Sequence, residues 1–384
     1  MVHQQMKRDK YDITILGFGI SSFCFLLYLY NNNLLSKHNI LILEKHKEPC
    51  LKSLDYKNVN SNSTLGSLIE PFRVNIFNEI ISQIDKDHDL NKYINLKAYS
   101  KIIRSMAKTF LRHLESFNNI TVKLDHNITN ISHSNHNINI DQYQTKTCVI
   151  SLGAEQDLSY IQSQDTENIL HNKTSKCILP EEIFNRDNFK VFHEKKIAII
   201  GSSHSSMSIA DALISNKVNY EKISLLCRNK FKVFFESRES ATENGFPFKE
   251  DEVCTETQTV NRFNGLRENS KYIYMNLNKF HIDEICNKKI SCEDYDIIVP
   301  CWGYRKRIPK INNTKHSEHI NSNKNFELTI KEKQYKNIFL FGISSKPKIE
   351  ITQKSFTKSV DGVWLYYNLL SEQLYKNILN GIKA

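Results

Sequence analysis

Two glycines at the end of an apolar segment are the first residues whose types and spacing could bind a ligand. The stretch "YDITILGFGISS" places a β-branched run before Gly17 and Gly19, and a helix-like apolar segment follows them. Gly17 permits a tight turn off a strand, and Gly19 lets the backbone approach a phosphate group at the helix N-terminus. The third small position of this turn is Ser22. The pattern predicts a strand, a glycine turn and a helix that bind a dinucleotide.

An acidic residue follows at the separation that such a site requires. The run "NILILEKH" predicts a second buried strand that ends at Glu44, about 20 residues beyond the turn. A carboxylate in this position accepts hydrogen bonds from the hydroxyls of an adenosine ribose. Glu44 therefore strengthens the prediction of a dinucleotide site.

The uncharged stretch 13–30 also has to be considered as a membrane span or a signal peptide. It is short for a span, and it ends in "YLYNNN", without the small residues of a signal-peptide cleavage site. The glycines lie where a strand meets a helix, which favours the dinucleotide site.

The same order of elements occurs a second time. The stretch "KKIAIIGSSHSSMSIADALI" predicts a strand, a turn and a helix, with small residues at Gly201, Ser203, Ser205 and Ser206. The next apolar run, "KISLLCRNK", ends at Arg228, which is as far from Gly201 as Glu44 is from Gly17. Serine keeps the turn small, and its hydroxyl can donate to a phosphate oxygen.

The two sites carry opposite charges at the ribose position. The acid Glu44 suits a free 2′-hydroxyl, whereas the guanidinium of Arg228 suits a 2′-phosphate. We therefore expect FAD at the first turn and NADPH at the second.

Three later glycines also follow buried strands. Gly153 ends "KTCVISLG", Gly303 ends "YDIIVPCWG" and Gly342 ends "NIFLFG". We expect each to return the chain to the edge of a sheet where a dinucleotide lies, with glycine permitting close passage.

This alternation of strands and helices predicts an α/β protein with two Rossmann-like dinucleotide-binding domains. Each domain is expected to have three layers around a parallel sheet. We assign residues 1–187 and 306–384 to an FAD-binding domain, and residues 188–305 to an NAD(P)H-binding domain inserted into it. The substrate is expected to bind where the two domains meet.

Composition limits the class of protein further. The net charge is +10, but the lysines are spread along the chain and no nucleic-acid-binding motif is present, so a nucleic-acid partner is not expected. The nine cysteines include no C-x-x-C pair, which favours reduced thiols in the cytoplasm. His133 and His136 lie in a predicted polar hairpin without further ligands at zinc-site spacing, so no metal site is expected.

Together these motifs resemble the two-dinucleotide-binding flavoprotein superfamily. They are GFGISS with Glu44, SLG at 151–153, GSSHSS with Arg228, CWGY at 301–304 and LFG at 340–342. Within that superfamily the chain is similar to class B flavin monooxygenases, especially the lysine and ornithine N-hydroxylases. The order of the motifs matches along nearly the whole chain.

The resemblance implies an oxidoreductase that uses FAD and NADPH. NADPH would reduce the flavin, and dioxygen would form a flavin C4a-hydroperoxide that oxygenates a nucleophilic nitrogen or sulfur of a small molecule. The cofactors carry this chemistry, so no catalytic side chain is assigned. The lysine-bearing segment of the N-hydroxylases has no counterpart in residues 55–72, and the substrate stays open.

Three alternatives remain at this stage. A reductase without a dithiol could pass electrons from NAD(P)H to a quinone or a protein, because a shared fold does not determine the acceptor. A dithiol reductase needs two cysteines close in sequence, and the chain has no such pair near either turn. A flavoprotein without activity would leave Arg228 without a phosphate to bind.

The C-terminal region is predicted to be helical from about Gln353. Its apolar residues include Leu369, Leu370 and Leu374. We expect this face to pack on the FAD-binding domain, because such stripes usually face a core, with contact to a membrane surface as the alternative.

Overall fold

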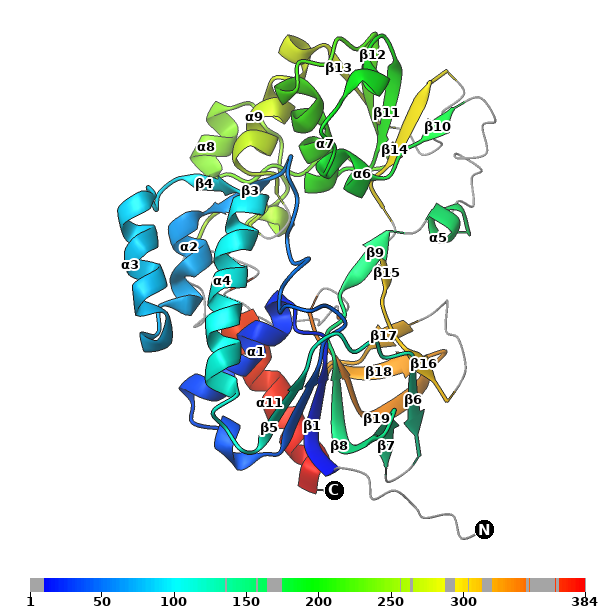
Figure 1. Cartoon of the computed structure of the whole chain (residues 1–384). Coiled ribbons are helices and arrows are strands. Elements are labelled where there is room, and N and C mark those ends of the chain that lie inside the picture. The colour runs from blue at the N-terminus through cyan, green and yellow to red at the C-terminus, as the bar shows by residue number, and fades with distance from the viewer. Residues whose placement is uncertain are drawn as a thin grey trace.

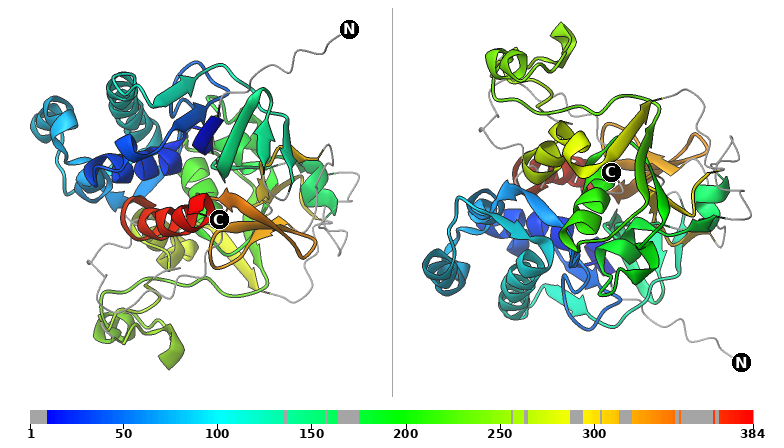
Figure 2. Two further views of the ribbon diagram at one scale, coloured as in Figure 1. Left: turned by 90° about the horizontal axis from the view of Figure 1, so that it is seen from below. Right: turned by 90° about the horizontal axis from the view of Figure 1, so that it is seen from above.

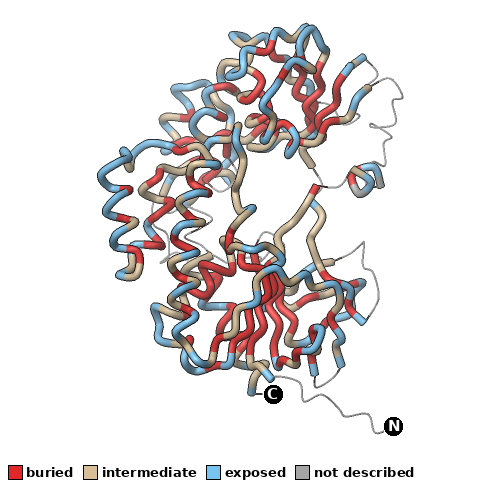
Figure 3. The backbone as a smooth tube through the Cα atoms, viewed as in Figure 1, coloured by how far each residue is buried: buried red, intermediate tan, exposed pale blue. Residues whose placement is uncertain are grey.

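The computed structural model describes most of the 384-residue chain. The described residues are 10–134, 137–156, 158–163, 175–255, 257–262, 265–286, 294–302, 304–312, 320–342, 345, 363 and 366–383. Figure 1 shows two α/β units, one above the other in that view, each built on its own sheet. The central strands of both sheets are buried (Figure 3). The predicted fold class is confirmed.

The lower unit in Figure 1 contains a sheet of ten strands among the described residues. Its parallel centre has the order β5-β2-β1-β8-β19, and antiparallel pairs extend it at β6–β7, β7–β8, β17–β18 and β18–β19. The strands are β1 (Lys10–Leu16), β2 (Ile40–Leu43), β5 (Ile120–Lys123), β6 (Asn130–His133), β7 (Ile138–Ile140), β8 (Tyr143–Ile150), β16 (Lys310–Ile311), β17 (Ile320–Ser322), β18 (Glu327–Ile330) and β19 (Lys333–Leu340).

Both faces of this sheet are covered, which explains the unbroken apolar run in β2 and the burial of the last four residues of β1. Ile40 and Ile42 point into a core formed with the helices α1 (Ile20–Asn31), α4 (Leu96–Leu114) and α11 (Ser371–Lys383). Leu41 and Leu43 point into a second core formed by β6, β7 and the strands near the C-terminus. Figure 2 shows α11, in red, beside α1, in blue.

The upper unit contains a sheet of five parallel strands among the described residues. Its order is β10 (Lys176–Cys177), β14 (Ile297–Pro300), β11 (Lys196–Ile200), β12 (Lys222–Cys227) and β13 (Ile282–Cys286). One face packs on α6 (Pro180–Phe184), α7 (His204–Ser215) and α9 (Glu268–Met275), and α5 (Leu158–Ser163) contributes Ile161 to the other.

Contacts between described residues join the units, and they include a pair of strands and several hydrogen bonds. The antiparallel pair β9 (Ala154–Gln156) and β15 (Tyr304–Lys306) runs between the sheets. In addition, the Asn58 amide donates to the Phe184 carbonyl of α6 (2.8 Å), and its side chain donates to the carbonyls of Ile183 and Arg186. Because β10 belongs to the second sheet but precedes residue 188, the division at 187 and 305 stays a proposal.

The remaining elements are short or lie beside the sheets. They are β3 (Asn60–Thr64), β4 (Tyr93–Asn95), α2 (Leu65–Ile69), α3 (Asn78–Asp87), α8 (Arg238–Glu243), a π-helix at Tyr366–Leu370 and 3-10 helices at Leu35–Lys37, Glu70–Phe72, Asn75–Phe77, Lys190–Phe192, Glu250–Glu252 and Leu277–Phe280.

The predicted packing of the C-terminal helix on the first unit is confirmed. Leu370 and Leu374 are buried in the same core as α1, and α11 begins at Ser371. The predicted start of the helical region, near Gln353, lies outside the described residues. In the part of the chain that the structure describes, no helix is long and apolar enough to cross a membrane.

The expectation of reduced thiols is wrong for one pair of cysteines. Cys227 and Cys286 form a disulfide between neighbouring strands, with their Cα atoms 4.8 Å apart. They lie 59 residues apart in sequence, so cysteine spacing alone did not indicate the pair. The free cysteines among the described residues are Cys24, Cys50, Cys148, Cys177, Cys254 and Cys301.

Candidate functional site: two dinucleotide-binding turns

The first glycine turn, residues 17–22, joins β1 to α1 at the carboxyl edge of the first sheet. The Gly17 amide donates to the Leu43 carbonyl at the end of β2 (2.8 Å). Gly17 has a φ of +93°, and a Cβ there would stand 2.7 Å from the carbonyl oxygen of Ser151. A side chain would be both strained and blocked, so the turn requires glycine.

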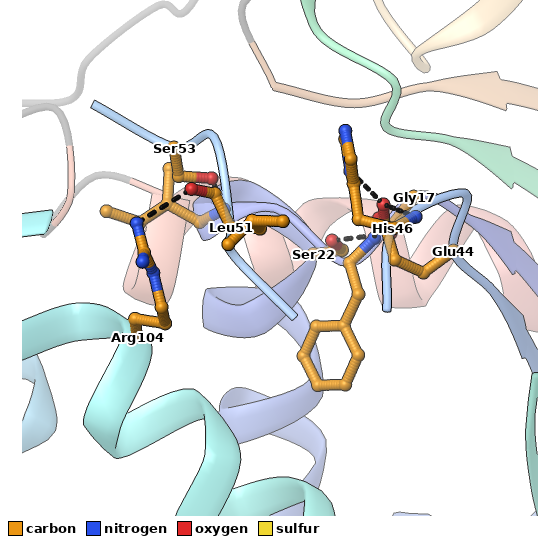
Figure 4. Close-up of polar contacts among 9 residues, drawn as sticks. Gly17, Ser22, Glu44, His46, Leu51, Ser53 and Arg104 are labelled. Carbon is orange, nitrogen blue, oxygen red and sulfur yellow. Dashed lines mark hydrogen bonds and ion pairs between the residues drawn. The ribbon is translucent and has the colours of Figure 1, made fainter. Parts of the chain in front are cut away.

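Hydroxyl groups hold this turn at the start of α1. Gly19 is the N-cap of the helix, and the buried Ser22 hydroxyl donates to the carbonyls of Gly17 (2.7 Å) and Gly19 (3.0 Å). The Ile20 amide donates to Ser53 Oγ (3.3 Å), from the segment drawn across the helix end in Figure 4. Ser22 is thus small enough for the turn, and its hydrogen bonds also stabilise the loop. Ser53 lies where a phosphate oxygen is expected, and no sequence pattern singled it out.

Glu44 is almost fully buried, with 6% of its surface exposed. Its Oε2 accepts from the Phe18 amide (2.6 Å), and its Oε1 accepts from the His46 amide (2.8 Å) and lies 2.5 Å from His46 Nδ1 (Figure 4). An ionised carboxylate offers about four acceptor positions, so about one remains for another donor. Glu44 orders the turn, and its predicted bond to a ribose hydroxyl stays a prediction.

Two further strand ends meet the first turn. Gly342, after β19, has a φ of +90°, and a Cβ there would stand 2.7 Å from Ser21 Oγ of α1. Ser151, after β8, has a buried hydroxyl without a partner among the described residues. Gly153 also has a positive φ (+74°), but nothing lies within 4 Å of its missing Cβ. A buried hydroxyl beside Gly17 and Gly342, unpaired among the described residues, fits a polar ligand.

Basic side chains lie around this turn. Arg104 of α4 donates to the Leu51 carbonyl (2.8 Å), and its Nε is buried with no partner in the described part of the chain. Burial, and then the charge of Arg307, lowers the pKa of Lys45. The Arg307 amide donates to the Gly153 carbonyl (3.1 Å). Arg307 is paired with Glu155 (2.8 Å) and Arg104 lies 4.0 Å from Asp55, so these charges are partly balanced by carboxylates. Sequence spacing did not indicate these residues.

The second glycine turn, residues 201–206, repeats the geometry of the first. The Gly201 amide donates to the Leu226 carbonyl of β12 (2.9 Å), as Gly17 does to Leu43. Gly201 has a φ of +131°, and a Cβ there would stand 3.1 Å from the buried Ser206 Oγ. Ser203 is the N-cap of α7 in an extended conformation, and Ser205 lies in its first turn.

His204 is the first residue of α7, and its Nε2 is buried without a partner among the described residues. Burial, and then the charge of Arg267, lowers the pKa of this histidine. Both effects favour the neutral form of the ring.

In the second unit, strand pairing moves the residue that corresponds to Glu44, the one expected to contact the ribose, by one place in the sequence. Leu16 pairs with Leu43, so Glu44 stands opposite Gly17, whereas Ile200 pairs with Leu226, so Cys227 stands opposite Gly201. Cys227 points into the same core as the residues of α7. The structural counterpart of Glu44 is thus an uncharged cysteine, and Arg228 follows it, exposed, at the carboxyl edge of the sheet. Removing the acid and supplying a guanidinium beside it both favour a 2′-phosphate.

Gly303 lies outside the described residues. The strand that precedes it, β14, pairs with β11, and the Cys301 amide donates to the Ile200 carbonyl (2.8 Å). The chain before Gly303 therefore reaches the edge of the sheet beside the second turn.

No protein-family profile and no curated protein matches the chain. Solved structures do match it. Ornithine hydroxylase from Pseudomonas aeruginosa is 12% identical, with a TM-score of 0.57, over 97% of this chain and 99% of its own. The chain therefore shares the fold of this hydroxylase, with two α/β units that are each built on a sheet of their own.

Other proteins of this fold carry out different reactions. The bacillithiol disulfide reductase Bdr of Staphylococcus aureus is 12% identical, with a TM-score of 0.54, over 97% of this chain and 99% of its own. The cadaverine monooxygenase DfoA of Erwinia amylovora, solved with FAD, is 12% identical, with a TM-score of 0.53, over 97% and 94% of the two chains. At these identities the similarity establishes the fold, and the reaction has to be argued from the site.

Proposed function

We propose that this protein is an FAD- and NADPH-dependent monooxygenase that oxygenates a nucleophilic nitrogen or sulfur of a small molecule. The observation that carries the proposal is the pair of glycine turns with the same strand–turn–helix geometry and different ribose positions. The first has a buried carboxylate at Glu44, and the second has Cys227 followed by Arg228.

The residues present at the first turn fit FAD. Gly17 and Gly342 let the strand ends and the start of α1 approach one another closely, because a Cβ at either position would clash with Ser151 or Ser21. The hydroxyl of Ser151 is buried there without a partner among the described residues. In this proposal FAD is bound by Gly17, Gly19, Ser22, Glu44, Gly153 and Gly342. NADPH is bound by Gly201, Ser203, Ser205, Ser206, Arg228 and Gly303.

Bound FAD would supply hydride acceptance from NADPH and the activation of dioxygen. The residues of this chain position the two cofactors and exclude water from the site. Ser22 fixes the loop that faces the pyrophosphate, Glu44 fixes the loop and receives the ribose, and Arg228 selects the phosphorylated coenzyme. The contacts between Asn58 and α6 hold the second unit over the first.

The competing candidate is an NAD(P)H-dependent reductase that passes electrons to an acceptor other than dioxygen. The observation that favours it is the shared fold with a disulfide reductase, because the same two-site arrangement serves either acceptor.

Product analysis during aerobic turnover separates the two candidates. The FAD-loaded protein is mixed with NADPH, dioxygen and one of a panel of amines that includes ornithine and cadaverine, the substrates in the names of two proteins with this fold. A monooxygenase forms about one hydroxylated amine for each NADPH oxidised with its preferred amine. Peroxide as the sole product with every amine, together with rapid turnover of a quinone or disulfide, would favour the reductase.

A further inference from the structure

The Cys227–Cys286 disulfide lies at the edge of the second sheet where a dinucleotide is expected. Cys227 ends β12 and Cys286 ends β13, and the two residues are paired in the parallel register. In α/β sheets, ligands bind outside the carboxyl ends of the strands. The disulfide therefore joins the two strands at the edge that carries the coenzyme site.

Within that site, Cys227 occupies the position that corresponds to Glu44 in the first unit. It stands opposite Gly201, as Glu44 stands opposite Gly17, and Arg228 is the next residue. A change in the bonding of Cys227 therefore acts on the residue next to Arg228, whose guanidinium is proposed to bind the 2′-phosphate.

The surroundings connect the disulfide to a helix and to the loop beyond Arg228. Glu284 Oε1 lies 3.6 Å from Cys286 Sγ and 3.9 Å from Cys227 Sγ, and the Tyr274 hydroxyl of α9 donates to both oxygens of Glu284 (3.1 Å each). Burial, and then Glu284, raises the pKa of Tyr274, so its hydroxyl remains a donor. The Tyr274 ring packs against Phe231, three residues after Arg228 (centroids 5.0 Å apart).

The two cysteines differ in their exposure to solvent. Cys227 has 1% of its surface exposed, whereas Cys286 reaches solvent. The ligand atoms of Cys227, Glu284 and Cys286 lie within 4.8 Å of one another. Two sulfurs bonded to each other have no thiolate to offer a metal, so the group as described is a redox pair rather than a metal site.

We propose that Cys227 and Cys286 form a reversible thiol–disulfide switch that sets the affinity of the second glycine turn for NADPH. This inference rests on the proposed function, because it takes Arg228 as the residue that binds the 2′-phosphate. The disulfide form is the high-affinity form.

The reaction partner is a low-molecular-weight thiol. Its thiolate attacks the accessible Cys286 sulfur, the bond to Cys227 breaks, and Cys227 leaves with the electron pair and takes up a proton. A second thiol then releases Cys286. In total, one protein disulfide and two thiols become two protein thiols and one small disulfide, and oxidation is the reverse reaction.

Reduction weakens coenzyme binding because it removes a covalent constraint. The Cα atoms of Cys227 and Cys286 are 4.8 Å apart, the ordinary spacing of neighbouring strands, so the sheet can keep its register while the ends of β12 and β13 are no longer linked. The freed end of β12 then holds Arg228 less firmly against the phosphate. We expect NADP⁺ to bind about 5- to 150-fold more weakly to the reduced protein, the usual range for coupled sites, with NAD⁺ binding little changed.

Calorimetric titration of the FAD-loaded protein with NADP⁺ and with NAD⁺ tests this inference. The protein is compared as oxidised and after reduction with dithiothreitol and anaerobic removal of the reagent. Cys286→Ser should bind NADP⁺ as weakly as the reduced wild type in both conditions. Cys177→Ser, which alters a free cysteine on β10 of the same sheet, should respond like the wild type. By reciprocity, saturating NADP⁺ should make the disulfide harder to reduce by the same factor.

The outcomes separate this inference from the function on which it rests. Equal NADP⁺ affinity in both redox forms, with NADP⁺ still preferred over NAD⁺, overturns the switch and leaves Arg228 in its role. Equal binding of NADP⁺ and NAD⁺ in both forms overturns both proposals. Peptide mapping of the oxidised protein that finds no Cys227–Cys286 link also overturns the switch, whether or not Cys286→Ser folds.

Discussion

A side chain at Gly17 would meet two obstacles at once, a left-handed backbone and the carbonyl oxygen of Ser151 only 2.7 Å from its Cβ. We expect Gly17→Ala to lose bound flavin and to lower the free energy of unfolding by more than about 2 kcal/mol, since strain and steric clash add. Flavin absorbance and thermal unfolding of the purified protein measure both effects.

The matched control is Gly245→Ala. Gly245 also has a positive φ (+64°), but nothing lies within 4 Å of its missing Cβ. This variant should keep its flavin and lose only about 1–2 kcal/mol, the cost of the left-handed backbone. If Gly17→Ala retains its full flavin content, residues 17–44 do not bind FAD.

Arg228 is the residue on which the choice of coenzyme depends. A guanidinium bonded to a phosphate contributes roughly 1.5–3 kcal/mol. Arg228→Ala should therefore weaken NADP⁺ binding about 10- to 150-fold, at about 1.4 kcal/mol per tenfold, and leave NAD⁺ nearly unaffected. Equilibrium titration with each coenzyme measures the difference.

Arg238→Ala provides the comparison for that experiment. Arg238 is paired with Glu250 on the same unit and is not assigned to the coenzyme. It should bind both coenzymes like the wild type. If Arg228→Ala loses affinity for NADP⁺ and for NAD⁺ equally, Arg228 does not distinguish the group at the 2′-position.

At the scale of single elements, α11 packs on the first sheet through side chains such as Leu374, which is fully buried. Leu374→Ala should lower the free energy of unfolding by about 2–5 kcal/mol, because the lost methyl groups leave a cavity. Chemical denaturation measures this, with Lys376→Ala as a surface control on the same helix. A stable Leu374→Ala protein that binds anionic vesicles less well than the wild type would instead indicate a membrane-facing helix.

The start of α7 makes stability depend on pH. Burial lowers the pKa of His204 in the folded chain, so the unfolded chain binds more protons just below the ordinary histidine value of about 6.5. Stability should therefore fall as the pH drops from about 7 to 5. His204→Gln should make that fall shallower.

Burial also lowers the pKa of His38 and His133, so part of the fall remains in His204→Gln. Melting temperatures at both pH values test this prediction. An identical pH dependence in the wild type and in His204→Gln would contradict the assignment of a buried, neutral ring.

The elements show what a sequence pattern can and cannot predict here. Glycines after apolar runs locate both turns, because a turn at the edge of a sheet needs a residue without Cβ. Counting residues from Gly201 makes Arg228 the counterpart of Glu44, but strand pairing gives that place to Cys227. Sequence separation cannot reveal a one-residue difference in register between two pairs of strands.

Contacts between segments that are distant in sequence could also not be predicted from the sequence. Ser53 reaches the start of α1 from an irregular loop, and its position depends on how that loop packs. The Cys227–Cys286 bond joins strands that only the completed sheet brings together. The hydroxyl of Ser151 stands two residues before the predicted Gly153, yet its burial is a property of three converging strands.

At the scale of the whole molecule, two sheets present glycine turns with different ribose positions, and the proposed function requires electrons to pass from a coenzyme at the second turn to FAD at the first. Anaerobic mixing of the FAD-loaded protein with NADPH or with NADH tests this requirement most directly. We expect NADPH to bleach the flavin absorbance, and NADH to do so more slowly at equal concentration. Flavin that NADPH leaves oxidised, or that NADH reduces faster, would contradict it.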